Sequence, residues 1–164
     1  MKRIALILVL IMVLGMAVAS AEITQGKDKF TGGNKINSVT ETSNPSELKQ
    51  LVLRKIITGN SPSYELWGER FTTKNFLFKK TFLEMKIDDT PIISINVKET
   101  SAMTYMDGPN MFSWVTVPIS SDIVEQIKIA NRIALRFQTA SGSYVYVLPD
   151  AVLAEWKEVI AAEK

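Results

Sequence analysis

Few residues in this chain are suited to chemistry, because the sequence contains neither histidine nor cysteine. Histidine is the commonest general base, and cysteine supplies thiol nucleophiles and thiolate metal ligands. Their absence excludes the usual forms of imidazole, thiol and zinc chemistry. The pair Gly32-Gly33 does not complete a phosphate-binding or dinucleotide-binding motif. Three weaker groups of residues remain as candidate sites.

The first group contains Met103, Met106 and Met111, with Tyr105 between them. Thioethers are soft ligands that suit Cu(I), so this segment is a candidate metal site. The alternative is structural, because methionine fills irregular gaps in a hydrophobic core. Since no histidine or cysteine supports a metal site, the sequence favours core packing and predicts no metal and no cofactor.

The second group consists of polar residues at two predicted turns, Asp88 with Asp89 and Asp107 with Asn110. Oxygen ligands on turns can bind Ca²⁺. Aspartate and asparagine are also the ordinary residues of turns, because their side chains hydrogen-bond to the nearby backbone. The sequence favours this structural role.

The third group interleaves aromatic and basic residues in the segment 71–80, namely Phe71, Lys74, Phe76, Phe78, Lys79 and Lys80. Such side chains can stack on and neutralise a polyanion or a glycan. A strand with a buried aromatic face and protective charges at a sheet edge gives the same pattern. Because loops on a rigid scaffold often carry function, we combine this segment with a predicted loop at 101–111. The candidate contact residues are then Phe76, Phe78, Lys79, Lys80, Tyr105 and Met106.

Residues 1–21 have the pattern of a signal peptide: a basic start, an apolar run and the small residues Ala19-Ser20-Ala21. We expect cleavage after Ala21 and a secreted or periplasmic protein that does not span the membrane. The alternative is an uncleaved membrane anchor, but the apolar run is about as short as a spanning helix can be, and the Ala19-Ser20-Ala21 site favours cleavage.

The positive charge of the chain belongs to this leader. Two of the 19 basic residues, Lys2 and Arg3, lie in it, whereas all 17 acidic residues follow it. The remainder therefore carries 17 charges of each sign and no net charge. No overall field would attract nucleic acid or an anionic lipid surface.

The elements that position these residues are mostly strands. The segment from Pro118 to Lys164 predicts a helix capped by Asp122, with Glu125 at the capping-box spacing, then two strands and a closing amphipathic helix. Earlier patterns predict a flexible lead-in at 22–34, an edge strand at 35–42, hairpins at 51–67 and 81–98, and a strand at 112–117. The sum is a single β-rich domain at 35–164, an antiparallel sandwich or open barrel of about seven to nine strands.

Three short segments of the sequence show a loose resemblance to a group of known domains. They are Asp28-Lys29-Phe30-Thr31-Gly32, the turn Ile87-Asp88-Asp89, and Ala130 followed by Ile133-Ala134-Leu135-Arg136. In these the chain resembles small exported bacterial domains of unknown function. The resemblance implies a β-sandwich and brings no activity and no functional residues. The chain departs from the pattern at Asp89, where an Asp-Gly turn would be usual.

These observations predict an exported, non-catalytic binding or interaction module of the bacterial cell envelope, without a cofactor. Its partner would be an envelope protein or a glycan. One alternative is an extracytoplasmic enzyme that uses carboxylates or a Tyr/Lys site, which a deep pocket with a perturbed pKa would favour. Another is a structural subunit of an envelope assembly.

Overall fold

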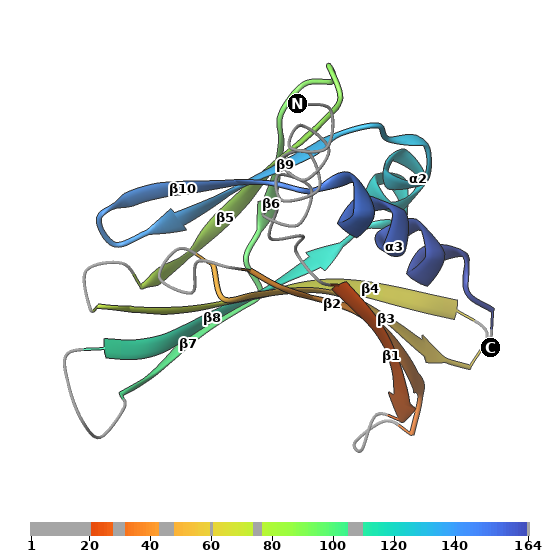
Figure 1. The fold of residues 1–164 in the computed structure, drawn as a ribbon, viewed down its shortest axis with the longest axis horizontal. Coiled ribbons are helices and arrows are strands. Elements are labelled where there is room, and N and C mark those ends of the chain that lie inside the picture. The colour runs from red at the N-terminus through yellow and green to blue at the C-terminus, as the bar shows by residue number, and fades with distance from the viewer. Residues whose placement is uncertain are drawn as a thin grey trace, which may run out of the picture.

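The computed structural model describes residues 21–27, 32–42, 48–59, 61–73, 77–104 and 110–163. These residues form ten strands and two helices. Two antiparallel sheets face each other, and neither closes into a barrel (Figure 1). The β-sandwich predicted from the sequence is therefore confirmed, with more strands than expected.

Sheet A has six strands in the order β1-β2-β3-β4-β8-β7. Their bounds are β1 Ala21–Lys27, β2 Asn34–Glu41, β3 Gln50–Thr58, β4 Ser61–Thr73, β7 Glu99–Thr104 and β8 Asn110–Ile119. Sheet B has four strands in the order β10-β9-β5-β6. Their bounds are β5 Phe78–Ile87, β6 Ile93–Asn96, β9 Ile133–Thr139 and β10 Gly142–Val147.

The two helices are α2 (Ser121–Ile129) and α3 (Asp150–Ala161). Sheet B covers one half of sheet A, and the helices cover the other half, where α3 contacts β1, β2 and β3 (Figure 1). No helix among the described residues is long and apolar enough to cross a membrane.

The core lies between the sheets and beneath the helices, because alternate residues of each strand point inward. In β9 the buried residues alternate: they are Ile133, Leu135 and Phe137. The closing helix α3, predicted as amphipathic, buries one stripe on its inner side, namely Val152, Leu153, Trp156, Val159 and Ile160. One packed interior therefore joins elements from both halves of the chain.

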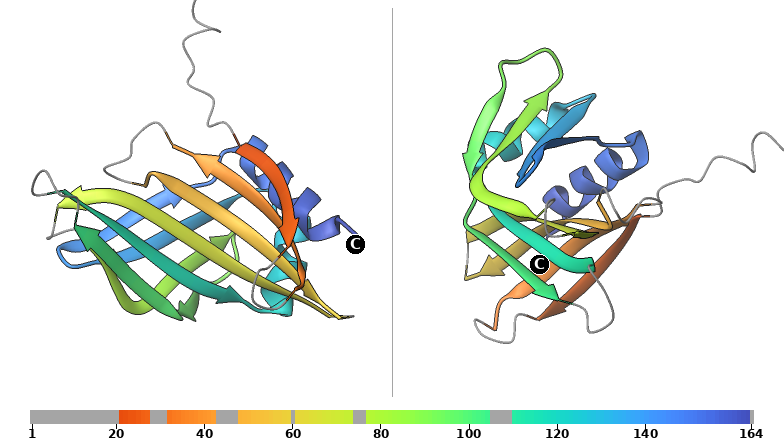
Figure 2. Two further views of the ribbon diagram at one scale, coloured as in Figure 1. Left: turned by 90° about the horizontal axis from the view of Figure 1, so that it is seen from below. Right: turned by 90° about the vertical axis from the view of Figure 1, so that its left-hand side faces the viewer.

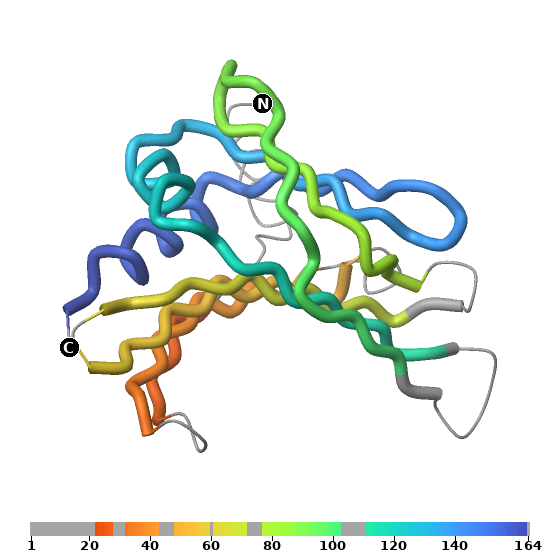
Figure 3. The backbone as a smooth tube through the Cα atoms, turned by 180° about the vertical axis from the view of Figure 1, so that it is seen from behind, coloured from red at the N-terminus to blue at the C-terminus, as the bar shows by residue number. Residues whose placement is uncertain are grey.

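Both predicted hairpins are present. Strands β3 and β4 meet at a turn where Gly59 has a φ of 66°, a conformation that favours glycine. Strands β5 and β6 form the second hairpin, with Leu83 and Met85 on its buried face. The chain then passes from sheet B to sheet A at residues 97–98, a crossing that Figure 3 shows from behind.

Three sequence expectations are wrong in detail. Part of the flexible lead-in expected at 22–34 is strand β1, which pairs with β2 along its whole length. The segment at 35–42 is therefore an inner strand of sheet A and not an edge strand. Of the loop expected at 101–111, residues 101–104 belong to β7 and residues 110–111 to β8, and the two strands pair. In each case the partner strand supplies backbone hydrogen bonds that a polar, weakly patterned sequence does not reveal.

The expected cap of α2 is also wrong. The N-cap is Ser120, and Asp122 lies inside the first turn of the helix. The Ser120 side chain makes no capping hydrogen bond. The carboxylate of Glu125 instead accepts a hydrogen bond from Lys128 at 2.6 Å. Asp122 still lies near the positive end of the helix dipole, which favours a negative charge.

Candidate binding face

Four aromatic side chains share the face of sheet A that points away from sheet B. Because residues two apart on a strand lie on the same face, the register of β4 and β8 places them together. Their neighbours on the other face, such as Leu66 and Val115, are buried in the core. We call this set the outer aromatic face; its members, all half-buried, are Trp67, Phe71, Phe112 and Trp114.

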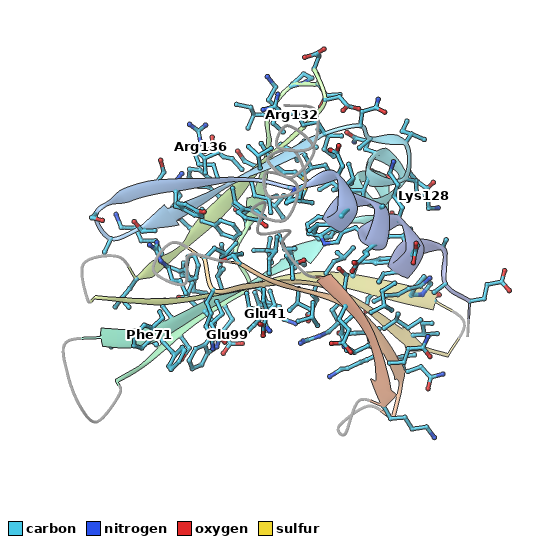
Figure 4. The ribbon with its side chains drawn as sticks, in the orientation of Figure 1. Glu41, Phe71, Glu99, Lys128, Arg132 and Arg136 are labelled. Atoms are coloured by element: carbon cyan, nitrogen blue, oxygen red, sulfur yellow. The ribbon has the colours of Figure 1, made fainter. Side chains whose placement is uncertain are left out.

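The strand register places the four rings beside one another. Phe71 lies directly opposite Phe112, and their ring centroids are 5.0 Å apart at an interplanar angle of 52°. Trp114 is opposite Glu69, which places it diagonally between Phe71 and Trp67. In Figure 4 Phe71 lies on the same side of sheet A as the exposed carboxylates of Glu41 and Glu99.

No described helix or strand covers this patch. The left view of Figure 2 looks directly onto sheet A, with sheet B and both helices behind it. Monomeric proteins seldom leave a continuous apolar patch uncovered unless it serves an interaction. The outer aromatic face is therefore the best candidate site in the described part of the chain.

Ion pairs surround the rings. The Nζ atom of Lys49 lies 3.0 Å from the Glu69 carboxylate and 4.7 Å from the centroid of the Phe112 ring. Glu65 lies 2.6 Å from Lys98 and 3.8 Å from Arg54. The hydrogen bond and charge of Glu65 raise the pKa of Lys98. Because these three cations are paired with carboxylates, the patch is suited to an uncharged ligand more than to a polyanion.

The structure divides the predicted contact residues between different places. Phe78 is buried, with its ring centroid 5.5 Å from that of Phe137. Lys79 and Lys80 are exposed at the start of β5, beside a register irregularity between β5 and β9. Three further candidates lie outside the described residues, namely Phe76, Tyr105 and Met106. Phe71 belongs to sheet A and Phe78 to sheet B, so these two rings lie on different sheets.

The candidate copper site is only partly described. In the β7–β8 register Met103 pairs with Phe112, and Met111 pairs with Thr104, so the two methionines are not cross-strand partners. Met106 lies outside the described residues. Among the described residues, no three of histidine, cysteine, aspartate and glutamate come close enough together to hold a metal ion.

Of the candidate calcium ligands, Asp88 is engaged by the backbone. Its carboxylate accepts the N–H of Asn131 at 2.9 Å and the N–H of Arg132 at 2.7 Å. Its own N–H donates to the Arg132 carbonyl oxygen at 2.9 Å. These bonds hold Asp88 at a φ of 48° and join the β5–β6 turn to the α2–β9 connection. Asp107 and the Asn110 side chain lie outside the described residues, and Asp89 is exposed.

We expect Asp88→Ala to lower the free energy of unfolding by about 2–4 kcal/mol, because two hydrogen bonds to a charged group are lost and alanine disfavours a positive φ. Asp88→Gly removes the same bonds without the φ penalty and should cost less. Urea denaturation followed by circular dichroism measures both. Asp89→Ala is the control, expected within about 0.5 kcal/mol of wild type. An equal effect at both aspartates would contradict this role for Asp88.

The described groups whose pKa values are shifted by burial lie away from three grooves on the surface. Burial lowers the pKa of Lys55 and raises those of Tyr64, Tyr146 and Glu155. None of these groups lines the grooves at the β1–β2 turn, at the β5–β6 turn or between β6 and α2. Each shift follows from packing between structural elements.

Comparison with known proteins finds no matching family model and no matching curated protein. Among solved structures, the crystal structure of invasion associated protein B from Bartonella henselae has a TM-score of 0.49 and 8% sequence identity. The match covers 87% of this chain and 97% of that chain. A likeness at this level assigns no function. The absence of a matching family model agrees with the loose resemblance stated from the sequence.

Proposed function

We propose that this chain is an exported, non-catalytic binding module of the bacterial cell envelope, and that the outer aromatic face holds its ligand. The signal-peptide pattern of residues 1–21 supports export. The single observation that carries the binding role is the set of four half-buried aromatic rings on the face of sheet A over which no described helix or strand lies. A rigid antiparallel sheet holds these rings in fixed positions, which lowers the entropy cost of binding.

A neutral glycan chain is the ligand class that fits this patch best. The negative faces of aromatic rings attract the C–H groups of a sugar ring. Between the rings, Glu69 and Lys49 offer polar atoms to hydroxyl groups, and Thr116 lies next to Trp67 across the strands. The cations at this face are paired with carboxylates, so a polyanion would have to displace existing ion pairs.

The rival role, an enzyme with a Tyr/Lys site, has a specific candidate in Lys55, whose Nζ lies 5.7 Å from the centre of the Tyr64 ring. Its ammonium group donates to the carbonyl oxygens of Ile160 and Ala162, both at 2.7 Å. A buried side chain with these hydrogen bonds is suited to holding α3 against sheet A and not to acting as a nucleophile or base. This geometry favours the binding role.

The test uses two probes of the glycan class, insoluble peptidoglycan sacculi in co-sedimentation and a tetrasaccharide of N-acetylglucosamine in a fluorescence titration. Two of the three tryptophans, Trp67 and Trp114, lie on the outer aromatic face, and Trp156 is buried. Binding should therefore change the fluorescence of the first two. We expect Trp67→Ala and Trp114→Ala each to weaken binding about tenfold.

The matched control is Ile129→Ala, which truncates an exposed apolar side chain on α2, far from the patch. It should bind like wild type. Absence of binding to both probes would overturn the glycan assignment. Capture of a defined envelope protein that Trp114→Ala abolishes would place a protein partner on the same face instead.

A further inference from the structure

Strand β10 is an edge of sheet B that carries none of the usual protection against pairing. Only β9 pairs with it among the described residues. Natural edge strands are commonly guarded by charged residues, proline or bulges. The sequence of β10, Gly142–Val147, contains no charge and no proline, and four of its residues are tyrosine or valine. These residue types favour strand pairing.

The hydrogen bonds to β9 identify which backbone groups remain at the open edge. Leu148 donates its N–H to the carbonyl oxygen of Ile133, so this pair is hydrogen-bonded. In an antiparallel ladder hydrogen-bonded and non-hydrogen-bonded pairs alternate. The N–H and C=O groups of Ser143, Val145 and Val147 therefore point away from β9, towards the open edge.

The same residues present apolar surface. The Val145 side chain is 54% exposed and that of Val147 is 43% exposed, both on the outer face of sheet B. Their charged neighbour Arg136, opposite Val145 on β9, is paired with Glu84 of β5 by a 2.9 Å hydrogen bond. Figure 1 shows the β9–β10 hairpin extending away from α2 and α3.

The sequence of the edge is nearly symmetric about Val145. One residue away on each side is a tyrosine, Tyr144 or Tyr146, and the next residues are Ser143 and Val147. An antiparallel pairing of two copies about a two-fold axis at Val145 places identical residue types opposite each other at the three central positions, 144 to 146. Each valine at the centre faces its equivalent, each Tyr144 faces Tyr146 of the other copy, and no charge meets a charge of the same sign.

We propose that two copies of this chain pair through β10 in this register and join their four-stranded sheets into one continuous sheet. The outward-pointing groups of Ser143, Val145 and Val147 then bond to Val147, Val145 and Ser143 of the other copy. A strand from a different protein could form the same backbone hydrogen bonds, but that pairing would not require the sequence of β10 to be symmetric about Val145. A short strand pair buries less area than a standard interface, so the dimer should dissociate on dilution.

Sedimentation equilibrium of the purified protein, as processed by the expressing cell, tests the proposal. Wild type should show a reversible monomer–dimer equilibrium. V145K places two lysines against each other at the two-fold axis and should raise the dissociation constant about a hundredfold. V145E should do the same, and an equimolar mixture of V145K and V145E should dimerise again. The control I129K adds a charge at an exposed site on α2 and should behave like wild type.

Disulfide trapping tests the register. The chain has no cysteine, so V145C introduces the only thiol. Directly opposed Cα atoms in a hydrogen-bonded antiparallel pair are about 5.5 Å apart, within the range that a disulfide spans. Oxidised V145C should run as a covalent dimer, and I129C should not. Circular dichroism confirms that each variant is folded.

A wild-type protein that stays monomeric at high concentration would overturn the proposal. So would a V145K variant that dimerises as well as wild type, or a mixture of opposite charges that remains monomeric. The dimer uses the edge of sheet B and leaves the outer aromatic face of sheet A free. Failure of either proposal therefore leaves the other standing.

Discussion

Replacing Trp156 by alanine is expected to lower the free energy of unfolding by about 3–5 kcal/mol. The side chain is fully buried on the inner side of α3, in the cluster that joins the helix to both sheets. Its indole nitrogen has no hydrogen-bond partner in the structure, so its contribution comes from packing. Alanine would leave a cavity that the surrounding strands cannot fill. Urea denaturation followed by far-ultraviolet circular dichroism measures the loss.

Trp114→Ala is the matched control, because it makes the same chemical change on the half-buried outer aromatic face. Solvent fills the space left there, and we expect a cost of about 1 kcal/mol. Trp156→Phe keeps a ring in the core and loses no hydrogen bond, so it should cost less than Trp156→Ala. Equal losses for Trp156→Ala and Trp114→Ala would show that α3 does not close the core.

The elements that the sequence predicts well are those whose signal is local. Ile133, Leu135 and Phe137 alternate within one strand, and Trp156 belongs to a stripe within one helix. Burial of one face leaves such a pattern in consecutive residues, whatever the partner element is. The order of helix, hairpin and helix after Pro118 could therefore be derived without a structure.

The failures concern elements that depend on distant partners. Strand β1 lies at an edge of sheet A, and most of its side chains are polar and exposed. Its backbone hydrogen bonds to β2 hold it in the sheet, whereas its own side chains give no sign of a strand. Strand β7 lies at the opposite edge of sheet A and is rich in small and polar residues. Residues of this kind are also typical of loops, so composition does not distinguish a short edge strand from a connection.

The candidate site was missed for a related reason. Phe71 and Phe112 lie far apart in the sequence, and only the pairing of β4 with β8 brings their rings together. The available signal was the same-face spacing of aromatic residues within each strand, two apart for Phe112 and Trp114 and four apart for Trp67 and Phe71. Such alternation shows that rings share a face but does not show whether that face is buried. The structure shows which face is buried, because Leu66 and Val115, on the opposite face of the same strands, belong to the core.

Lys55→Met is expected to lower the free energy of unfolding by about 2–3 kcal/mol, because the Lys55 ammonium group fastens the end of α3 to sheet A. Its Nζ donates to the carbonyl oxygens of Ile160 and Ala162, and the last turn of α3 contains no basic residue of its own. Lys55, from β3, thus supplies the positive charge that a helix C-terminus favours. Methionine keeps the apolar length of the side chain and removes both bonds.

The pH dependence of this loss separates the buried lysine from an ordinary surface one. Burial lowers the pKa of Lys55 in the folded state from the value of 10.5 that we take for the unfolded chain. The unfolded chain therefore binds more protons between these two pKa values, and wild-type stability should rise with pH across that window. The neutral amine still has two N–H groups for the two carbonyl oxygens, so the bonds survive deprotonation.

The difference in stability between wild type and Lys55→Met should therefore grow as the pH approaches 10.5, measured by urea denaturation at a series of pH values. Subtracting the variant removes the titration of the other groups. The control Lys86→Met, at an exposed position of β5, should stay within about 0.5 kcal/mol of wild type. A difference that shrinks as pH rises would mean that the charge of Lys55, more than its hydrogen bonds, holds the helix in place.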